Sequence, residues 1–164
     1  MADRPFRPMR RTRQELSRAE TEDILRRGRT GILAVNGDGG YPYTVPLNYV
    51  YQDGKIYFHC ARAGHKFDAL ARDSRVSFCV IDRDQVVPDE FATYYKSAVA
   101  FGHARLLEGE AVAQAAYDLG FKYNPAPEKV RAEVEAGLPA VACFEIEIDH
   151  LTGKQAKGLL TKQN

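Results

Sequence analysis

The sequence has little of what several protein classes require. Its 164 residues include only three cysteines, Cys60, Cys79 and Cys143, which lie far apart and form no CxxC pair. This count and spacing argue against a disulfide framework and a zinc ribbon. Because each cysteine lies in an apolar stretch, we expect buried free thiols, which fit a cytoplasmic protein. The longest apolar runs are only a few residues long, so no membrane-spanning segment is expected.

An excess of charge of one sign is also missing. The chain has 23 basic and 22 acidic residues, a net charge of +1, which gives no general electrostatic reason to expect a nucleic-acid partner. Five arginines and two prolines gather in the first fourteen residues. No apolar segment follows Arg10 and Arg11, so a twin-arginine export signal is not expected. We expect residues 1–16 to form an arm that is either flexible or packed on a partner subunit.

Common catalytic motifs are absent as well. The sequence contains no GxSxG, no Walker loop and no GxGxxG, which disfavours a hydrolase or a nucleoside triphosphatase. The remaining histidines, His65, His103 and His150, show neither HExxH nor HxH spacing. His59 and Cys60 are neighbours on an expected strand and point to opposite faces, so they do not readily bind one metal. No metal site is therefore predicted.

Hydrophobic periodicity predicts a mainly β chain with peripheral α-helices. Six strands are expected, at 30–35, 43–49, 55–61, 75–81, 94–107 and 140–149. Helices are expected at 17–27, 64–72 and 110–120 and from Pro127, the first opened by a Ser17–Glu20 capping box. Asp53-Gly54 predicts a tight hairpin, and residues 82–92 are interpreted as a loop. The pattern favours an antiparallel barrel over 17–153, followed by a tail at 154–164.

One strand-to-helix junction carries a pattern typical of anion binding. Gly64, His65 and Lys66 open a helix, where free backbone N–H groups and the helix dipole attract negative charge. A lysine in the first turn opposes that dipole unless an anion is bound. Lys66 therefore indicates a bound phosphate, with a solvated lysine as the alternative.

The strand before this junction and the strand at 43–49 offer further candidates. Ile56, Phe58 and Cys60 form an apolar face, so His59 projects to the opposite side, which is either a ligand surface or an interface; a purely structural histidine is the alternative. Pro46 cannot donate to a ladder and belongs at an edge or a bulge. An interrupted strand there leaves backbone groups free for a heteroaromatic ring, with an ordinary edge strand as the other interpretation.

These residues resemble the pyridoxamine 5′-phosphate oxidase-like family of flavin-binding split barrels, and within it the Nim-type nitroimidazole-resistance group. The resemblance covers about residues 10–157. It is carried by GYPYTVPLNY at 40–49, KIYFHCA at 55–61, GHK at 64–66 and KSAVAFG at 96–102. It implies a six-stranded antiparallel split β-barrel and a homodimer with two FMN sites at the subunit interface.

The resemblance also implies which residues contact FMN. One strand faces the isoalloxazine ring, a second lines the flavin edge through backbone groups, a helix start holds the phosphate, and a serine lies near the phosphate or the ring. In that order these residues are Thr44, Val45, Pro46, Leu47 and Asn48; Phe58, His59, Cys60 and Ala61; Gly64, His65 and Lys66; and Ser97. His59 matches the Nim-type histidine on the reacting side of the flavin and is the candidate catalytic residue.

The sequence departs from the family pattern at Cys60, where serine is common, and at His65, where a lysine or a small residue is frequent. The arginine-rich phosphate motif and the arginine-bearing C-terminal segment of true pyridoxamine phosphate oxidases are absent, which makes pyridoxamine phosphate a poor substrate. The expectation is therefore an FMN-dependent cytoplasmic oxidoreductase that takes hydride from NADH or NADPH and reduces a nitro or quinone-like molecule. The alternatives are a haem- or deazaflavin-binding split barrel and a non-enzymatic flavin-binding dimer.

Overall fold

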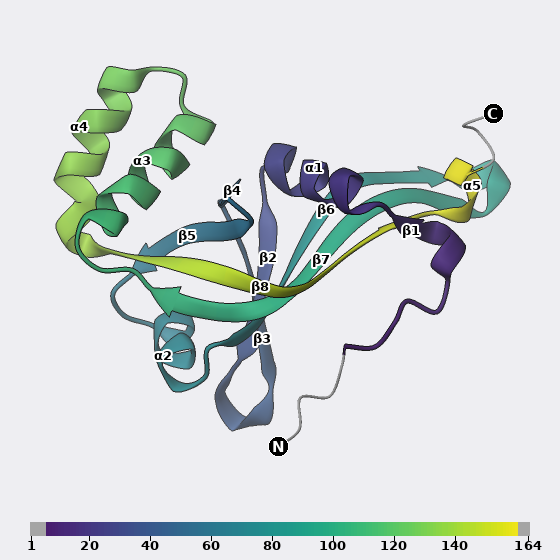
Figure 1. Ribbon diagram of the computed structural model, residues 1–164, viewed down its shortest axis with the longest axis horizontal. Helices are drawn as coiled ribbons and strands as arrows, with labels where there is room; N and C mark the ends of the chain where they lie inside the picture. The colour runs from purple at the N-terminus through teal and green to yellow at the C-terminus, as the bar shows by residue number, and fades with distance from the viewer. Residues whose placement is uncertain (1–5, 161–164) are drawn as a thin grey trace.

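A computed structural model describes residues 6–160, in which one strongly twisted, antiparallel sheet forms the body of the protein (Figure 1). The sheet has eight strands in the order β3-β2-β6-β7-β8-β5-β4, with β1 added alongside β8. In chain order the strands are β1 (Glu15–Leu16), β2 (Gly31–Asn36), β3 (Pro42–Leu47), β4 (Val50–Gln52), β5 (Lys55–Ala61), β6 (Arg75–Val87), β7 (Ala92–Leu106) and β8 (Val141–Gln155).

Five α-helices lie around this sheet. They are α1 (Arg18–Arg27), α2 (His65–Arg72), α3 (Glu110–Tyr123), α4 (Pro127–Gly137) and α5 (Lys157–Leu160). Figure 1 shows α3 and α4 as a hairpin at one end of the molecule, with α5 and β1 at the other end. The two outer strands of the sheet, β3 and β4, do not pair with each other, so the barrel is split rather than closed.

Two local sequence signals are confirmed in detail. Ser17 caps α1: its side chain accepts from the backbone N–H of Glu20, and the Glu20 carboxylate accepts from the Ser17 N–H at 2.9 Å, which satisfies two amides at the helix start. Asp53 and Gly54, at φ 51° and 77°, form the turn between β4 and β5. Positive φ at both central residues matches the right-handed twist of the flanking strands.

The structure has eight strands where the sequence predicts six. The expected strand at 43–49 ends at Leu47 as β3, which pairs with β2. A separate strand, β4, follows at Val50–Gln52 and pairs with β5, and the arm contributes β1. The interpretation of 82–92 as a loop was wrong: β6 and β7 continue as a paired hairpin until Val87 opposes Ala92. The last strand runs to Gln155, beyond the expected domain boundary at 153.

The core lies between the inner face of the sheet and α1 and α2. Phe58, Phe78 and Ile146 are among its fully buried members from β5, β6 and β8, and Ile24 and Leu25 join the same cluster from α1. The cysteines are free, as expected, with Cys143 buried and Cys60 and Cys79 half-buried. Burial raises the pKa of all three thiols, which keeps them protonated and unreactive at neutral pH.

A bulge between β7 and β8 depends on a glycine. The strand register shifts between Phe101 and Gly102, and a Cβ atom at Gly102 would lie 2.0 Å from the backbone oxygen of Glu147. Because a backbone atom of the paired strand cannot move aside cheaply, we expect Gly102→Ala to lower the free energy of unfolding by about 1–3 kcal/mol. The measurement is urea unfolding followed by circular dichroism.

The matched control is Gly137→Ala in α4, where a Cβ atom meets nothing within 4 Å. There alanine should raise the free energy of unfolding by about 0.5–1 kcal/mol, the ordinary preference for alanine over glycine in a helix. Equal midpoints for Gly102→Ala and the parent would show that the bulge relaxes around the methyl group.

Candidate functional site

Two strand edges at the split in the barrel carry free backbone groups. Within residues 6–160, β3 pairs with β2 alone. On β5, the partner strand β4 reaches only from Lys55 to Tyr57, so the same edge is unpaired from Phe58 to Ala61. Backbone N–H and C=O groups on such an edge are available to hydrogen-bond a polar ring.

The candidate residues of β3 divide between the two faces of the strand. Thr44 and Pro46 are exposed on the outer face, and Asn48 is exposed just beyond the end of the strand. Val45 and Leu47 are half-buried and pack on the hydrophobic core. Their side chains therefore serve the core, and these two residues can offer a ligand only their backbone groups.

The candidate residues of β5 divide in the same way. Phe58 is fully buried and stacks on Phe144 with ring centroids 5.4 Å apart, and Cys60 packs against the same core. His59 and Ala61 are exposed on the opposite face. The structure thus presents the His59 imidazole to the outer side, while Phe58 and Cys60 can contribute only main-chain groups.

The start of α2 lies beside β3. The His65 ring stacks on Tyr43 with centroids 4.1 Å apart, and His65 Nε2 accepts from the backbone N–H of Asp38 at 3.3 Å. Gly64 precedes the helix at φ 103°, a conformation that favours glycine, and no side chain caps the helix there. The first-turn amides therefore donate no hydrogen bond to any described side chain, and the helix start lies near Tyr43 of β3.

Lys66 is the cation of this helix start. It is half-buried, and no carboxylate among residues 6–160 forms an ion pair with it. Its charge is felt by both candidate residues at the end of β5. Burial lowers the pKa of His59 and the Lys66 charge lowers it further, whereas the same charge partly offsets the burial that raises the pKa of the Cys60 thiol. These residues fit an anionic group.

An apolar cavity of about 290 Å³ adjoins this site. His59 and Asn48 are two of its lining residues. Glu133 and Tyr123 are the other lining residues with a titratable side chain. The rest of the wall comes from α3, α4, the short turn after α4 and the start of β8: Ala116, Leu119, Gly120, Val134, Gly137, Leu138 and Val141. The cavity can receive a small apolar molecule whose polar end meets His59 or Asn48.

The end of α3 fixes the position of Asn48. The Tyr123 hydroxyl accepts from the backbone N–H of Tyr49 at 3.0 Å and lies 2.8 Å from the Tyr49 carbonyl oxygen and 2.6 Å from that of Arg29. Asn48 Nδ2 donates to the same Arg29 oxygen at 3.2 Å. Tyr123 therefore holds the junction between β3 and β4, where the sheet splits.

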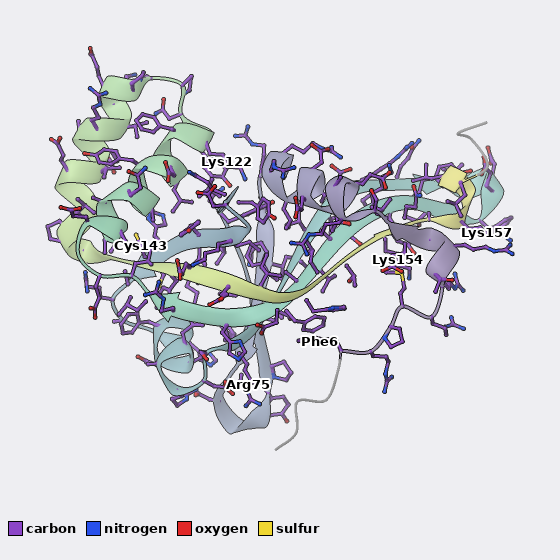
Figure 2. All side chains as sticks on the ribbon, viewed as in Figure 1. Phe6, Arg75, Lys122, Cys143, Lys154 and Lys157 are labelled. Carbon is purple, nitrogen blue, oxygen red and sulfur yellow. The ribbon has the colours of Figure 1, made fainter. Side chains whose placement is uncertain are left out.

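Lys122 strengthens this junction. Its Nζ donates to the Gly28 carbonyl oxygen at 2.6 Å, just beyond the end of α1, and lies 4.0 Å from the centroid of the Tyr49 ring. Figure 2 shows Lys122 between α3 and α1. Burial lowers the pKa of Lys122 to about 8, and the nearby Arg29 adds to the effect. These contacts tie α3 to α1 beside the cavity.

Ser97 lies away from the other candidate residues within one chain. It is on β7 and pairs with Ile81 of β6 on one side and Lys154 of β8 on the other. The pairing places it on the same outer face as Pro46, with β2 and β6 in between. The structure thus brings together the candidates of β3, β5 and α2, but not Ser97.

Sequence reasoning missed the contribution of α3 and α4. Both helices were expected, but only as peripheral elements, and the apolar stripe of α3 indicated packing and nothing more. The cavity exists because α4 packs on α3 and α3 packs on β5 and β8, an arrangement that no local pattern specifies. Tyr123 in particular comes after the apolar stripe of α3, and no sequence motif around it indicates its role.

Residues 6–160 lack two further kinds of feature. No group of three or more His, Cys, Asp or Glu side chains in this part of the chain is placed to hold a metal ion. None of its helices is both long enough and apolar enough to span a bilayer.

Comparison with known sequence families shows to which family the chain belongs. The sequence model of the pyridoxamine 5′-phosphate oxidase family, Pyridox_ox_2, matches residues 17–155. The chain belongs to this family. No curated protein matches it.

Solved structures share the split-barrel fold. A conserved hypothetical protein of Mycobacterium tuberculosis aligns with a TM-score of 0.79 at 24% identity, over 93% of this chain and 92% of that one. A candidate 5-nitroimidazole antibiotic resistance protein of Bacteroides thetaiotaomicron gives 0.71 at 21% identity, over 86% of each chain. A FAD-binding protein of Mesorhizobium loti gives 0.64 at 25% identity, over 88% and 98%. The split-barrel fold predicted for this family member is confirmed.

Proposed function

We propose that the protein is an FMN-dependent oxidoreductase that reduces a small, flat nitro or quinone-like molecule with electrons from NADH or NADPH. The observation that carries the proposal is the convergence at one place of three features: a helix start with an unpaired lysine, two unpaired strand edges, and an apolar cavity that begins at His59 and Asn48. Membership of a flavin-binding split-barrel family supports the choice of cofactor.

The residues of this chain divide the work of holding FMN. Lys66 and the first amides of α2, opened by Gly64, would bind the phosphate. The free edges of β3 and β5 would hydrogen-bond the polar edge of the ring. Thr44 and Pro46 would lie against its face from the outer side of β3. FMN supplies the electron-transfer chemistry when bound, and the protein supplies position and electrostatics.

His59 and the cavity would handle the acceptor molecule. The wall built by α3 and α4 is apolar except for Glu133 and Tyr123, and Glu133 is its only charged side chain. It therefore favours an uncharged ring, because a charged ring would be buried there with almost no partner of opposite charge. A nitro or quinone oxygen at the His59 side of the cavity could take a proton from the imidazole as the molecule gains electrons. Tyr123, which holds the Asn48 junction, would keep this side of the cavity in position.

A homodimer is part of the proposal, since Ser97 is separated from the other candidate residues in one chain. The outer face of the sheet that carries Thr44, Pro46 and Ser97 also exposes large apolar side chains, with Ile81 55% and Phe101 39% exposed. An apolar face of this kind is typical of an interface. A second copy packed on it would cover these side chains and close the flavin site.

The dimer predicts a solution mass of twice the 18.4 kDa of one chain. Light scattering on the purified protein at micromolar concentration measures this directly. A stable mass of one subunit would refute the shared interface.

The three free thiols support a cytoplasmic location for such a dimer, where thiols stay reduced.

The test of the function begins with the absorption spectrum of the purified protein. We expect the spectrum of a flavin. The spectrum of haem or of a deazaflavin would show that the protein binds that cofactor instead of FMN. The FMN-loaded protein is then mixed anaerobically with NADPH or NADH and either a 5-nitroimidazole or a naphthoquinone. We expect oxidation of the nicotinamide that depends on both the protein and the acceptor.

The same experiment separates an enzyme from a non-enzymatic flavin-binding dimer. Chemical reduction of the bound flavin bypasses the nicotinamide, so the acceptor step is observed by itself. Failure of the reduced protein to pass electrons to any acceptor, together with tight FMN binding, would contradict the oxidoreductase and favour the non-enzymatic dimer.

A further inference from the structure

A second cleft lies at the opposite end of the molecule from α3 and α4. It has a volume of about 680 Å³ and is formed by the segment 10–14 and the last described helix, α5. Figure 2 shows Lys157 at this end, where the chain leaves β8, with Lys154 close by. Its lining residues are Arg10, Arg11, Thr12, Arg13, Gln14, Lys157 and Leu160.

The charges of this cleft are of one sign. Four of its seven described lining residues are cations, namely Arg10, Arg11, Arg13 and Lys157, and none is a carboxylate. None of these four forms an ion pair with any carboxylate of residues 6–160. Like charges gathered in a hollow repel one another, so the arrangement favours an anion as counter-charge.

Several arginines elsewhere in the chain form ion pairs. Arg18 lies 2.6 Å from Glu22, Arg27 lies 2.8 Å from Asp23, and Arg75 lies 2.6 Å from Asp73. The protein therefore neutralises exposed arginines of α1 and of the start of β6 with nearby carboxylates. Within residues 6–160 the cleft arginines have no such partner, and neither do the scattered Arg29, Arg62, Arg83 and Arg131, but only in the cleft do several unpaired cations gather in one hollow.

A buried polar group in the wall of the cleft gives an independent sign of a ligand. Gln14 is only 5% exposed, and its side-chain oxygen has no hydrogen-bond partner. A buried amide oxygen without a donor is costly, and such groups normally have a donor from the protein, water or a bound molecule. The side-chain oxygen of Gln155 is in the same state. Because the Gln14 oxygen is buried, a ligand in the cleft reaches it only after the amide rotates, which the broad terminal torsion of glutamine allows.

We infer that this cleft binds an organic phosphate: a phosphate ester whose anionic group meets the arginines and Lys157, and whose own hydroxyl or amino group donates to Gln14. Guanidinium groups suit the phosphate because they offer several N–H donors to its oxygens. The inference does not depend on the proposed flavin site, since Lys66 lies on α2 and takes no part in this cleft.

The experiment is calorimetric titration of the purified protein with AMP, which has both a phosphate and hydroxyl donors. Inorganic phosphate and adenosine serve as probes that each keep only one of the two features. We expect AMP to bind more tightly than inorganic phosphate and adenosine to bind poorly. Because the arginines are exposed, added salt should weaken AMP binding.

The double variant Arg11→Gln/Arg13→Gln should weaken AMP binding at least about 10-fold, the smallest effect expected for lost charge-assisted hydrogen bonds. The matched control is Arg131→Gln, an exposed arginine of α4 outside the cleft. Lys66→Ala should leave AMP binding unchanged, so failure of this inference is distinct from failure of the flavin site. Equal AMP affinity in the parent and the double variant, or no binding at all, would overturn it.

Gln14→Leu provides a readout that a merely structural glutamine would not give. Replacing an unsatisfied buried amide by an apolar side chain should leave the melting temperature of the free protein unchanged or raise it. AMP affinity should nevertheless fall about 2- to 12-fold, the effect of losing one neutral hydrogen bond. Affinity for inorganic phosphate should not change. Unaltered AMP affinity would remove Gln14 from the site and overturn the assignment of a ligand donor.

Discussion

His59→Gln is expected to lower the turnover of a nitro substrate by about 10²- to 10⁴-fold, the usual range for the loss of a general acid. The imidazole is exposed on the outer face of β5 and lines the apolar cavity, so it is the titratable group in place to protonate a molecule bound there. Glutamine keeps much of the volume and the hydrogen-bonding capacity of the side chain but cannot donate a titrating proton. The measurement is anaerobic nitro reduction by both proteins loaded with FMN.

The pH dependence of the parent provides the second half of this prediction. The His59 side chain is exposed but partly enclosed at the cavity, and this partial burial together with the Lys66 charge holds its pKa below the ordinary value of 6.5, so the imidazole is mostly neutral at pH 7. If the protonated ring is the active form, turnover should rise as the pH falls below 6.5 and decline as the pH rises through the lowered pKa. This limb should be missing in His59→Gln.

FMN affinity separates catalysis from folding in this comparison. Because the phosphate end of the site is untouched, His59→Gln should bind FMN about as tightly as the parent. Matching rates and matching pH profiles would remove His59 from the mechanism and leave it as a structural or flavin-contacting residue.

Lys66→Ala should weaken FMN binding about 10- to 150-fold, because a charge-assisted contact to phosphate contributes about 1.5–3 kcal/mol. Lys66 is half-buried at the start of α2 and has no carboxylate partner in the described part of the chain, so its removal breaks no ion pair. Fluorescence titration of the apoprotein with FMN measures the change. Lys129→Ala, at an exposed position of α4, is the matched control.

Riboflavin shows whether the effect belongs to the phosphate. It lacks that group, so it should bind the parent poorly and be almost indifferent to the loss of Lys66. Equal FMN affinity in Lys66→Ala and the parent would place the phosphate elsewhere. A similar loss of affinity for riboflavin would instead indicate that the variant disturbs the ring site.

Several features of this protein follow from its sequence alone because they depend on neighbouring residues. The Ser17–Glu20 capping box, the Asp53-Gly54 turn and the helix start at Gly64 each need only a few residues in a row. The two-residue period of a strand is equally local, and it places His59 on the face opposite Phe58. The resemblance to the family rests on such local segments, taken in order.

Only the tertiary structure decided how those segments meet. Residues 82–85 are polar and residues 82–87 are mostly exposed, so their own pattern indicates a loop, yet pairing with β7 makes them a strand. Tyr123 reaches Tyr49, 74 residues away in the sequence, and the cavity beside His59 forms between helices that local patterns treat as independent. Long-range strand pairing and helix docking depend on the complementarity of surfaces distant in sequence, which periodicity and capping signals do not encode.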